Sequence, residues 1–350
     1  MGPSVEQIET CGVIIIGAGP IGLETAIELK ARGHRPVVLD AGAIGQQIVD
    51  FPPMTRWFSS ADRLGIGGLP FVTSASEKGT REEYLAYLRM AVEFFDLDVR
   101  TFQRVQDIQR SGDGRFTISS VTLSGLSRLF RAEALVLATG GTARSRRLGV
   151  PGEDLPHVHL RFSEPHRFHG RRLVIVGAKN SACDAAVFAQ RCGADVTLVC
   201  RGQSIHPRVK YWIRPELEAM IKSGQVKALY ETEVVAIDPE KVRLRSGSDE
   251  SLREIDADDV YLAIGFESDT SLFESIGAEL EGKARSVVHD PKTMETSIGN
   301  LYVAGTAVAG TQARFRVYIE NSHIHAKRIA AALSGESPPQ EPDYPLLPES

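Results

Sequence analysis

The sequence predicts an α/β fold with two Rossmann-like dinucleotide-binding domains. The chain has 350 residues, of which 42% are hydrophobic and 24% are charged, so it is long and apolar enough to form two packed cores. An apolar strand, a glycine-rich turn, a helix and a second strand follow one another twice, with first glycines at Gly17 and Gly177. A duplicated unit of this kind favours two nucleotide-binding domains over one long domain.

The first unit starts with the apolar strand V-I-I-I, followed by the turn G-A-G-P-I-G (17–22) and a helical pattern. Gly17 permits the tight turn, Gly19 lets the backbone approach a pyrophosphate, and Gly22 lets the helix pack close to the strand. Asp40 ends the next strand. A carboxylate there can accept the hydroxyl protons of an adenosine ribose but repels a 2′-phosphate, so this unit is predicted to bind FAD or NAD.

The second unit differs from the first at two informative positions. Arg201 stands where the first unit has its aspartate, and a guanidinium matches a phosphate dianion, which indicates NADPH. In the turn G-A-K-N-S-A (177–182), Lys179 replaces the middle glycine, and its side chain could contact a phosphate or the nicotinamide ribose. Asn180 and Ser181 could either cap the helix or bind the pyrophosphate.

Three further glycine turns follow apolar strands, in L-V-L-A-T-G-G (135–141), Y-L-A-I-G-F (261–266) and A-G-T (304–306). We expect the first and third beside FAD and the second beside NADPH. The predicted FAD contacts are Gly17, Gly19, Pro20, Gly22, Asp40, Gln47, Thr139, Gly140, Gly305 and Thr306. The predicted NADPH contacts are Gly177, Lys179, Asn180, Ser181, Arg201, Lys210 and Gly265.

The order of these motifs predicts an FAD domain interrupted by an NADPH domain. We expect residues 1–150 to form the first part of the FAD domain and residues 151–294 to form the NADPH domain. Residues 295–335 then return to the FAD domain, with a final helix over 318–333, and residues 336–350 form a proline-rich tail.

The overall charge and composition exclude several classes of partner from what we expect. A net charge of −5 gives no general attraction to nucleic acid or to anionic lipid, so neither is expected as a partner. No apolar run approaches the roughly 20 residues of a membrane span, and the N-terminus does not resemble a signal peptide, so we expect a cytoplasmic protein. The four cysteines include no C-x-x-C pair and no metal-ligand spacing, so we expect neither a disulfide framework nor a metal.

The chain resembles the low-molecular-weight thioredoxin reductases and, more closely, the bacillithiol disulfide reductase family. The likeness extends to about residue 333. It is carried by F-S-S-A-D-R-L-G-I-G-G-L-P-F (58–71), V-P-G-E-D-L (150–155), G-A-K-N-S-A (177–182), R-G (201–202), K-Y-W-I-R-P-E-L-E (210–218), T-M-E-T (293–296) and Y-I-E-N (318–321). This resemblance implies NADPH-driven reduction, through FAD, of a small-molecule or protein disulfide by a homodimer or homotetramer.

One position departs from the family pattern. Members carry a cysteine within the first glycine turn, as in G-G-G-P-C-G, whereas this chain has Ile21 there. The most obvious thiol next to the flavin is therefore missing. If a disulfide is reduced, either the reduced flavin attacks it directly or the acceptor supplies its own thiols.

The catalytic side chains are not identified by the sequence, because hydride transfer between two cofactors needs no side-chain acid or base. His323 and His325 are candidate proton donors near the flavin, although an i, i+2 pair cannot share one helix face. Two other functions stay open. One is a flavin monooxygenase, although the segment R-F-S-E-P-H-R-F-H-G (161–170) of this chain does not match the usual fingerprint of those enzymes. The other is an electron-transfer or redox-sensing flavoprotein that works with a protein partner such as ferredoxin.

Overall fold

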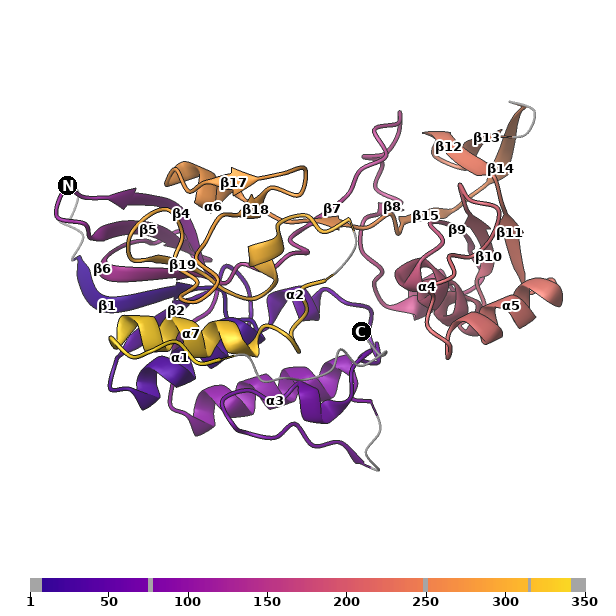
Figure 1. The fold of residues 1–350 in the computed structure, drawn as a ribbon. Coiled ribbons are helices and arrows are strands. Elements are labelled where there is room, and N and C mark those ends of the chain that lie inside the picture. The colour runs from indigo at the N-terminus through magenta and orange to yellow at the C-terminus, as the bar shows by residue number, and fades with distance from the viewer. Residues whose placement is uncertain (1–7, 75–77, 248–250, 314–315, 341–350) are drawn as a thin grey trace. The chain divides into compact units, whose positions relative to one another are not determined.

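The computed structural model describes residues 8–74, 78–247, 251–313 and 316–340, which divide into two compact units (Figure 1). The first unit contains the residues up to 50, residues 54–144 and those from 267 onward; the second contains residues 51–53 and 145–266. Most of the predicted tail, 341–350, lies outside the described residues. In the part of the chain that the structure describes, no helix has both the length and the apolar character needed to cross a membrane.

The first unit is built on a seven-stranded sheet in the order β3-β2-β1-β6-β5-β4, with β19 paired to the end of β6. Helices α1 and α7 pack against each other, and they lie together below the sheet in Figure 1. Its helices and strands are β1 (Glu9–Ile16), α1 (Pro20–Ala31), β2 (Pro36–Leu39), α2 (Gln46–Val49), η1 (Ala61–Arg63), α3 (Arg81–Phe94), β3 (Asp98–Arg100), β4 (Gln103–Arg110), β5 (Phe116–Thr122), β6 (Ser127–Leu137), α6 (Ser271–Ser275), β17 (Leu280–Glu281), β18 (Ser286–Val287), β19 (Leu301–Val303), η4 (Gly305–Ala309) and α7 (His323–Leu333).

The second unit repeats the arrangement on a five-stranded sheet in the order β11-β10-β9-β15-β8, beside a three-stranded antiparallel sheet, β12-β13-β14. Its elements are β8 (Val158–His159), η3 (Pro165–Phe168), β9 (Arg172–Val176), α4 (Asn180–Arg191), β10 (Asp195–Val199), α5 (Arg214–Lys222), β11 (Val226–Leu229), β12 (Thr232–Ile237), β13 (Lys241–Ser246), β14 (Leu252–Asp256) and β15 (Asp259–Leu262). The two segments that run between the units, β7 (Arg144–Ser145) and β16 (Phe266–Glu267), form a two-stranded sheet.

The local sequence explains how the key elements form. The last four residues of β1 are buried in the interior of the sheet, where the strand pairs in parallel with β2 on one side and β6 on the other. Helix α1 starts at Pro20, a residue favoured in the first turn because it lacks the N–H that would be unpaired there. Helix α3 starts with a capping box in which Thr80 and Glu83 each bond the other's backbone N–H.

Two boundaries differ from the prediction. The second unit ends at Phe266 rather than at residue 294, because the segment after it packs on the first unit: Phe273 of α6 is buried in the same core as Ile108 and Phe116. The last helix starts at His323 rather than at Tyr318, since the Asn321 side chain accepts the Tyr318 N–H and holds a turn before the helix.

Candidate functional site

The glycine turn of the first unit has two glycines that the protein itself requires and one that it does not. Gly17 has φ +116°, and a Cβ on it would overlap the carbonyl of Ala138, while a Cβ on Gly22 would overlap the carbonyl of Gly17. Gly19, by contrast, has no heavy atom within 4 Å of an added Cβ. Gly19 is the N-cap of α1 and provides no side-chain hydrogen bond to the N–H groups of the first turn. This arrangement fits a pyrophosphate at the helix N-terminus.

Asp40 ties the turn to the end of the second strand. Its Oδ2 accepts the Ala18 N–H at 2.7 Å and its Oδ1 accepts the Gly42 N–H at 2.8 Å. Burial raises the pKa of Asp40 above its ordinary value, although these two backbone bonds act in the opposite direction. Each carboxylate oxygen keeps a second lone pair, so Asp40 can still accept ribose hydroxyl protons.

Gln47 holds the A-T-G turn in place. Its amide donates to the Thr139 carbonyl at 2.5 Å and its Oε1 accepts from the Thr142 N–H and hydroxyl, at 3.2 and 2.8 Å. Gln47 was predicted to contact FAD, which stays a prediction; in the structure its side chain holds the turn, with Thr142, which the sequence missed, as a partner. Within the described residues the buried Thr139 hydroxyl has no hydrogen-bond partner, as expected for a group that bonds a ligand.

The A-G-T turn lies at the same sheet edge. β19 pairs with β6 in parallel, from Leu301 opposite Leu135 to Val303 opposite Leu137, so both strands end together. A Cβ on Gly305 would lie 3.3 Å from Cβ of Ile21. The carboxyl edge of such a sheet is where α/β proteins bind their ligands. Three predicted turns therefore meet at one edge of the first unit.

The two candidate histidines have separate surroundings, and neither is free. His323 Nδ1 lies 2.6 Å from Glu24 Oε2, and its Nε2 lies 3.0 Å from the Arg63 carbonyl. His325 Nδ1 accepts the Gly305 N–H at 3.2 Å, and burial lowers the pKa of His325 to about 3. This ring is therefore neutral at physiological pH, and the proton-donor role expected for one of the two histidines stays a prediction.

The glycine turn of the second unit is closed by a loop. A Cβ on Gly177 would lie 2.5 Å from the Ala263 carbonyl oxygen, so glycine is needed there. Lys179 caps α4 with extended backbone and no side-chain capping bond. The side chain of Asn180 accepts the Lys210 N–H at 3.0 Å, so it anchors the following loop instead of capping the helix. Ser181, next along α4, is exposed.

The basic side chains around this loop face solvent. Arg201 and Arg208 are exposed, and within the described residues neither guanidinium group has a hydrogen-bond or ion-pair partner, although the Arg208 backbone N–H donates to His206 Nδ1 at 3.2 Å. Lys210 Nζ lies 6.0 Å from the Trp212 ring. Burial lowers the pKa of His206, and the charges of Lys179 and Arg208 lower it further, which shows that cations gather here. The two unpaired guanidinium groups, with these further cations nearby, suit a phosphate.

Gly265 lies in the A-I-G turn that follows β15 in the second unit. It has φ +103°, and its carbonyl accepts the Arg146 N–H at 3.0 Å. β15 lies parallel to β9, from Asp259 opposite Leu173 to Leu262 opposite Val176, so the A-I-G turn and the glycine turn leave the sheet at the same edge. The second unit thus reproduces the geometry of the first.

The chain matches the pyridine nucleotide-disulphide oxidoreductase family over residues 14–305. It is 33% identical over 321 residues to "Bacilliredoxin reductase Bdr" of Bacillus subtilis (strain 168), with 92% of this chain and 97% of that protein covered. The fold is similar to that of bacillithiol disulfide reductase Bdr from Bacillus cereus, with a TM-score of 0.88, 32% identity, and 93% and 99% of the two chains covered. The chain belongs to the bacillithiol disulfide reductase family.

Membership in the bacillithiol disulfide reductase family makes the chain an NADPH-dependent flavin oxidoreductase of the disulfide-reductase type, with FAD and NADPH as cofactors. The fold is of the thioredoxin reductase type, as the sequence predicted. A more distant relative is a ferredoxin–NADP reductase of Ignicoccus hospitalis, 28% identical over 299 residues, which are 83% of this chain and 88% of that protein. When bound, FAD supplies the two-electron chemistry, and the protein orients the cofactors and excludes water.

Three of the four cysteines, Cys11, Cys183 and Cys200, are buried. Ile21 is buried against Gly305. Cys11 is buried in β1, and burial raises the pKa of Cys183 to about 12 and that of Cys200 to about 11, so both are protonated thiols. Since the thiolate is the nucleophile in disulfide exchange, these side chains are poorly suited to it.

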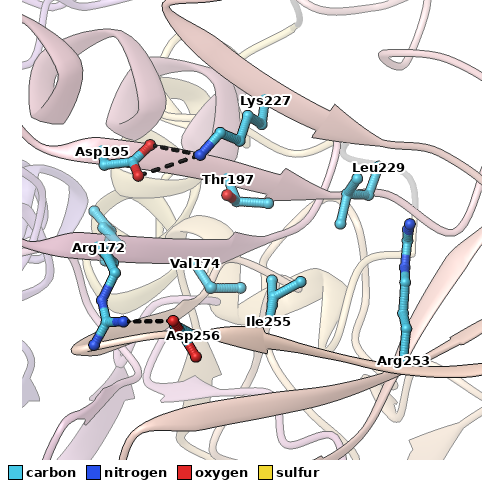
Figure 2. Close-up of a pocket in the computed structure, with 10 residues that line it drawn as sticks. Arg172, Val174, Asp195, Thr197, Lys227, Leu229, Arg253, Ile255 and Asp256 are labelled. Atoms are coloured by element: carbon cyan, nitrogen blue, oxygen red, sulfur yellow. Dashed lines mark hydrogen bonds and ion pairs between the residues drawn. The ribbon is translucent and has the colours of Figure 1, made fainter.

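A hollow of about 330 Å³ in the second unit lies away from the glycine turn, between the parallel sheet and β14 (Figure 2). Four charged side chains that line it form two ion pairs, Asp195 with Lys227 at 3.2 Å and Arg172 with Asp256 at 2.9 Å. Arg253 donates to the Thr232 hydroxyl. The hollow therefore lacks the uncompensated charge seen near Arg201, and it is not the dinucleotide site.

Glu24, which was not among the residues expected at the site, pairs with His323; its signal was a carboxylate in the first half of a helix whose other charged residues, Glu28 and Lys30, come later. Burial alone would lower the pKa of His323, but the hydrogen bond and charge of Glu24, with the Arg63 carbonyl, raise it above 6.5. A histidine with a raised pKa stabilises the fold fully below its unfolded pKa and loses that effect as pH rises through the folded pKa.

We expect Glu24→Gln to lower the free energy of unfolding by about 1.5–3 kcal/mol at pH 6 and by less at pH 9.

Thermal unfolding of the FAD-bound protein at both pH values measures this difference. Glu28→Gln is the matched control, because Glu28 lies one turn along α1 and pairs with Arg32, which does not titrate in this range. Equal destabilisation by Glu24→Gln at pH 6 and pH 9 would contradict the ionic pair.

Proposed function

We propose that the enzyme reduces a low-molecular-weight disulfide with electrons from NADPH, and that no cysteine of the chain takes part. In balanced form, NADPH, a proton and R-S-S-R give NADP⁺ and two R-SH. The observation that carries this proposal is Ile21, buried against Gly305 at the position where the family pattern has its cysteine. The names of the Bacillus relatives suggest a bacillithiol disulfide as the acceptor to test first.

The two cofactor sites follow from the two glycine turns. We propose that Gly17, Gly19, Pro20 and Gly22 hold the FAD pyrophosphate and that Asp40 holds its ribose, while the Thr139 hydroxyl and the 305–306 turn contact the rest of the cofactor. In the second unit, Lys179, Ser181, Arg201 and Arg208 would bind NADPH, with Gly177 and Gly265 giving close approach. The turns and loop that carry these contacts would be held in place by Gln47 and by the hydrogen bond between the Asn180 side chain and the Lys210 N–H.

Counting electrons tests the cysteine-independent route. We expect anaerobic NADPH titration to reduce the enzyme fully with about one NADPH per FAD, because one hydride carries the two electrons that flavin accepts. The measurement is flavin absorbance during stepwise addition of NADPH. A second equivalent of NADPH, consumed before excess NADPH accumulates, would reveal a redox-active disulfide and overturn the proposal.

Alkylation provides the control. We expect iodoacetamide treatment of the folded, NADPH-reduced enzyme to leave disulfide reduction unchanged, because Cys11, Cys183 and Cys200 are buried. Only Cys192 is partly exposed, and it follows the end of α4 that lies opposite Lys179. Loss of activity that tracks modification of one cysteine would contradict a thiol-free path.

Electron transfer to a ferredoxin is the second candidate. It is favoured by the same missing thiol and by the likeness to a ferredoxin–NADP reductase. The two functions separate in one assay, in which NADPH oxidation is followed with bacillithiol disulfide alone and with ferredoxin coupled to cytochrome c. Turnover with ferredoxin and none with any small disulfide would replace the first proposal by the second.

A further inference from the structure

We propose that His325 is a positioning residue for FAD: a neutral imidazole that accepts the Gly305 N–H and fixes the turn at 305–306 against the cofactor. This inference rests on the FAD chemistry of the family and not on which acceptor the enzyme uses. It assigns His325 a role different from proton transfer. The argument uses one hydrogen bond, the backbone it holds, and the surroundings of the ring.

The hydrogen bond determines the tautomer. The Gly305 N–H is a donor only, so His325 Nδ1, at 3.2 Å, must offer its lone pair and the ring proton must sit on Nε2. The ring is buried, with 9% of its surface exposed. Burial first, and then the electrostatic effects of His289, Arg328 and His323, disfavour a second proton. His325 therefore acts as a fixed acceptor.

The backbone that His325 holds is conformationally demanding. Gly305 has φ +67°, in the left-handed region, and it lies directly against Ile21 of α1. The next residue, Thr306, lies against the A-T-G turn, since a Cβ on Gly141 would be 3.3 Å from the Thr306 carbonyl oxygen. The 305–306 turn thus contacts both of the other segments that are predicted to bind FAD. Its position therefore sets the spacing between those segments at this edge of the sheet.

Helix α7 gives His325 a rigid support. The helix packs along α1, which begins at the glycine turn, so the imidazole links the end of β19 to the helix that receives the pyrophosphate. Without the acceptor, the Gly305 N–H would be buried and unpaired. A buried N–H without a partner is costly, so the turn would rotate to find one and would lose its alignment with FAD.

Two substitutions separate the hydrogen bond from the volume of the ring. His325→Leu fills similar space without an acceptor, whereas Asn Oδ1 in His325→Asn can take the place of Nδ1. We expect His325→Leu to raise the Kd for FAD about 10-fold and to change the fluorescence of the bound flavin, and His325→Asn to restore most of both properties. FAD binding to the apoprotein is measured by fluorescence titration, with circular dichroism as the check on folding.

His34→Leu is the matched control. His34 Nε2 lies 3.0 Å from the hydroxyl of Ser334, which follows the carboxyl end of α7. The substitution therefore removes a contact to this helix at the end opposite His325. We expect the FAD Kd to stay unchanged in this variant. If His325→Leu binds FAD as tightly as the unaltered protein, or if the Leu and Asn variants lose affinity equally, the positioning role is wrong.

A measurement on the unaltered protein covers the case in which His325→Leu does not fold. With ¹⁵N-labelled histidine, the nine histidines of the FAD-bound enzyme can be followed by NMR from pH 5 to pH 8. We expect His325, assigned through the spectrum of His325→Asn, to remain an Nε2–H tautomer throughout. A His325 signal that titrates in this range, or that shows the proton on Nδ1, would overturn the proposal.

Discussion

Gly22→Ala is expected to destroy FAD binding and to destabilise the first unit by about 3 kcal/mol or more. The added methyl group would overlap the carbonyl of Gly17. Gly17 cannot retreat, because its N–H donates to the Leu39 carbonyl at 2.8 Å and because its own Cα faces the Ala138 carbonyl. The turn and the start of α1 must therefore separate. Thermal unfolding of the apoprotein and the FAD content after reconstitution measure the two effects.

Gly19→Ala is the control for this prediction. Gly19 has φ −78° and ψ 176°, which alanine adopts freely, and nothing lies within 4 Å of the added Cβ. We expect the apoprotein of this variant to unfold at an unchanged temperature but to bind FAD at least about 10-fold more weakly, since the methyl group would stand where the pyrophosphate approaches. If both variants lose apoprotein stability equally, the proposed division of roles between the two glycines is incorrect.

Arg201→Gln is expected to raise the KM for NADPH about 10- to 100-fold and to leave the KM for NADH nearly unchanged. A hydrogen bond to a charged group contributes about 1.5–3 kcal/mol, and only NADPH carries the 2′-phosphate that the guanidinium would bind. Arg201 is exposed and, in the described part of the chain, unpaired, so its loss breaks no internal contact. Steady-state kinetics with both coenzymes give the ratio of kcat/KM values that tests this expectation.

Arg191→Gln provides the matched control. Arg191 is an exposed arginine of the same unit, at the carboxyl end of α4, where it pairs with Glu216. We expect this variant to keep the coenzyme preference of the unaltered enzyme. If Arg201→Gln lowers kcat/KM equally for NADPH and NADH, the guanidinium does not bind the 2′-phosphate.

Local patterns in the sequence predicted the fold and the two glycine turns well. Strand and helix periodicity, with Gly17 and Gly177 between them, depends on residues close together in the chain, and the structure keeps those elements. The end of the second unit was harder to predict, because Phe273 joins the core of the first unit through contacts with residues more than a hundred positions earlier. Such packing leaves no local mark in the sequence.

The roles of individual polar side chains were also outside the reach of the sequence. Gln47 and Asn180 stand near the expected cofactors, yet each is committed to a backbone group that folding brings beside it. Glu24 and His323 are 299 positions apart, and only the packing of α1 on α7 makes them a pair. Hydrogen bonds between distant segments depend on tertiary distances of a few ångströms, which periodicity does not encode.

The sequence by itself determined that this protein has two dinucleotide-binding units, that one ends its second strand in an acid and the other in an arginine, and that Ile21 stands where the family pattern that it resembles has a cysteine. Only the tertiary structure showed that His325 is buried and accepts the Gly305 N–H, and that burial raises the pKa values of Cys183 and Cys200. The physical reason is that charge and residue type are properties of the chain, whereas protonation state depends on burial and on neighbours that only the folded protein supplies.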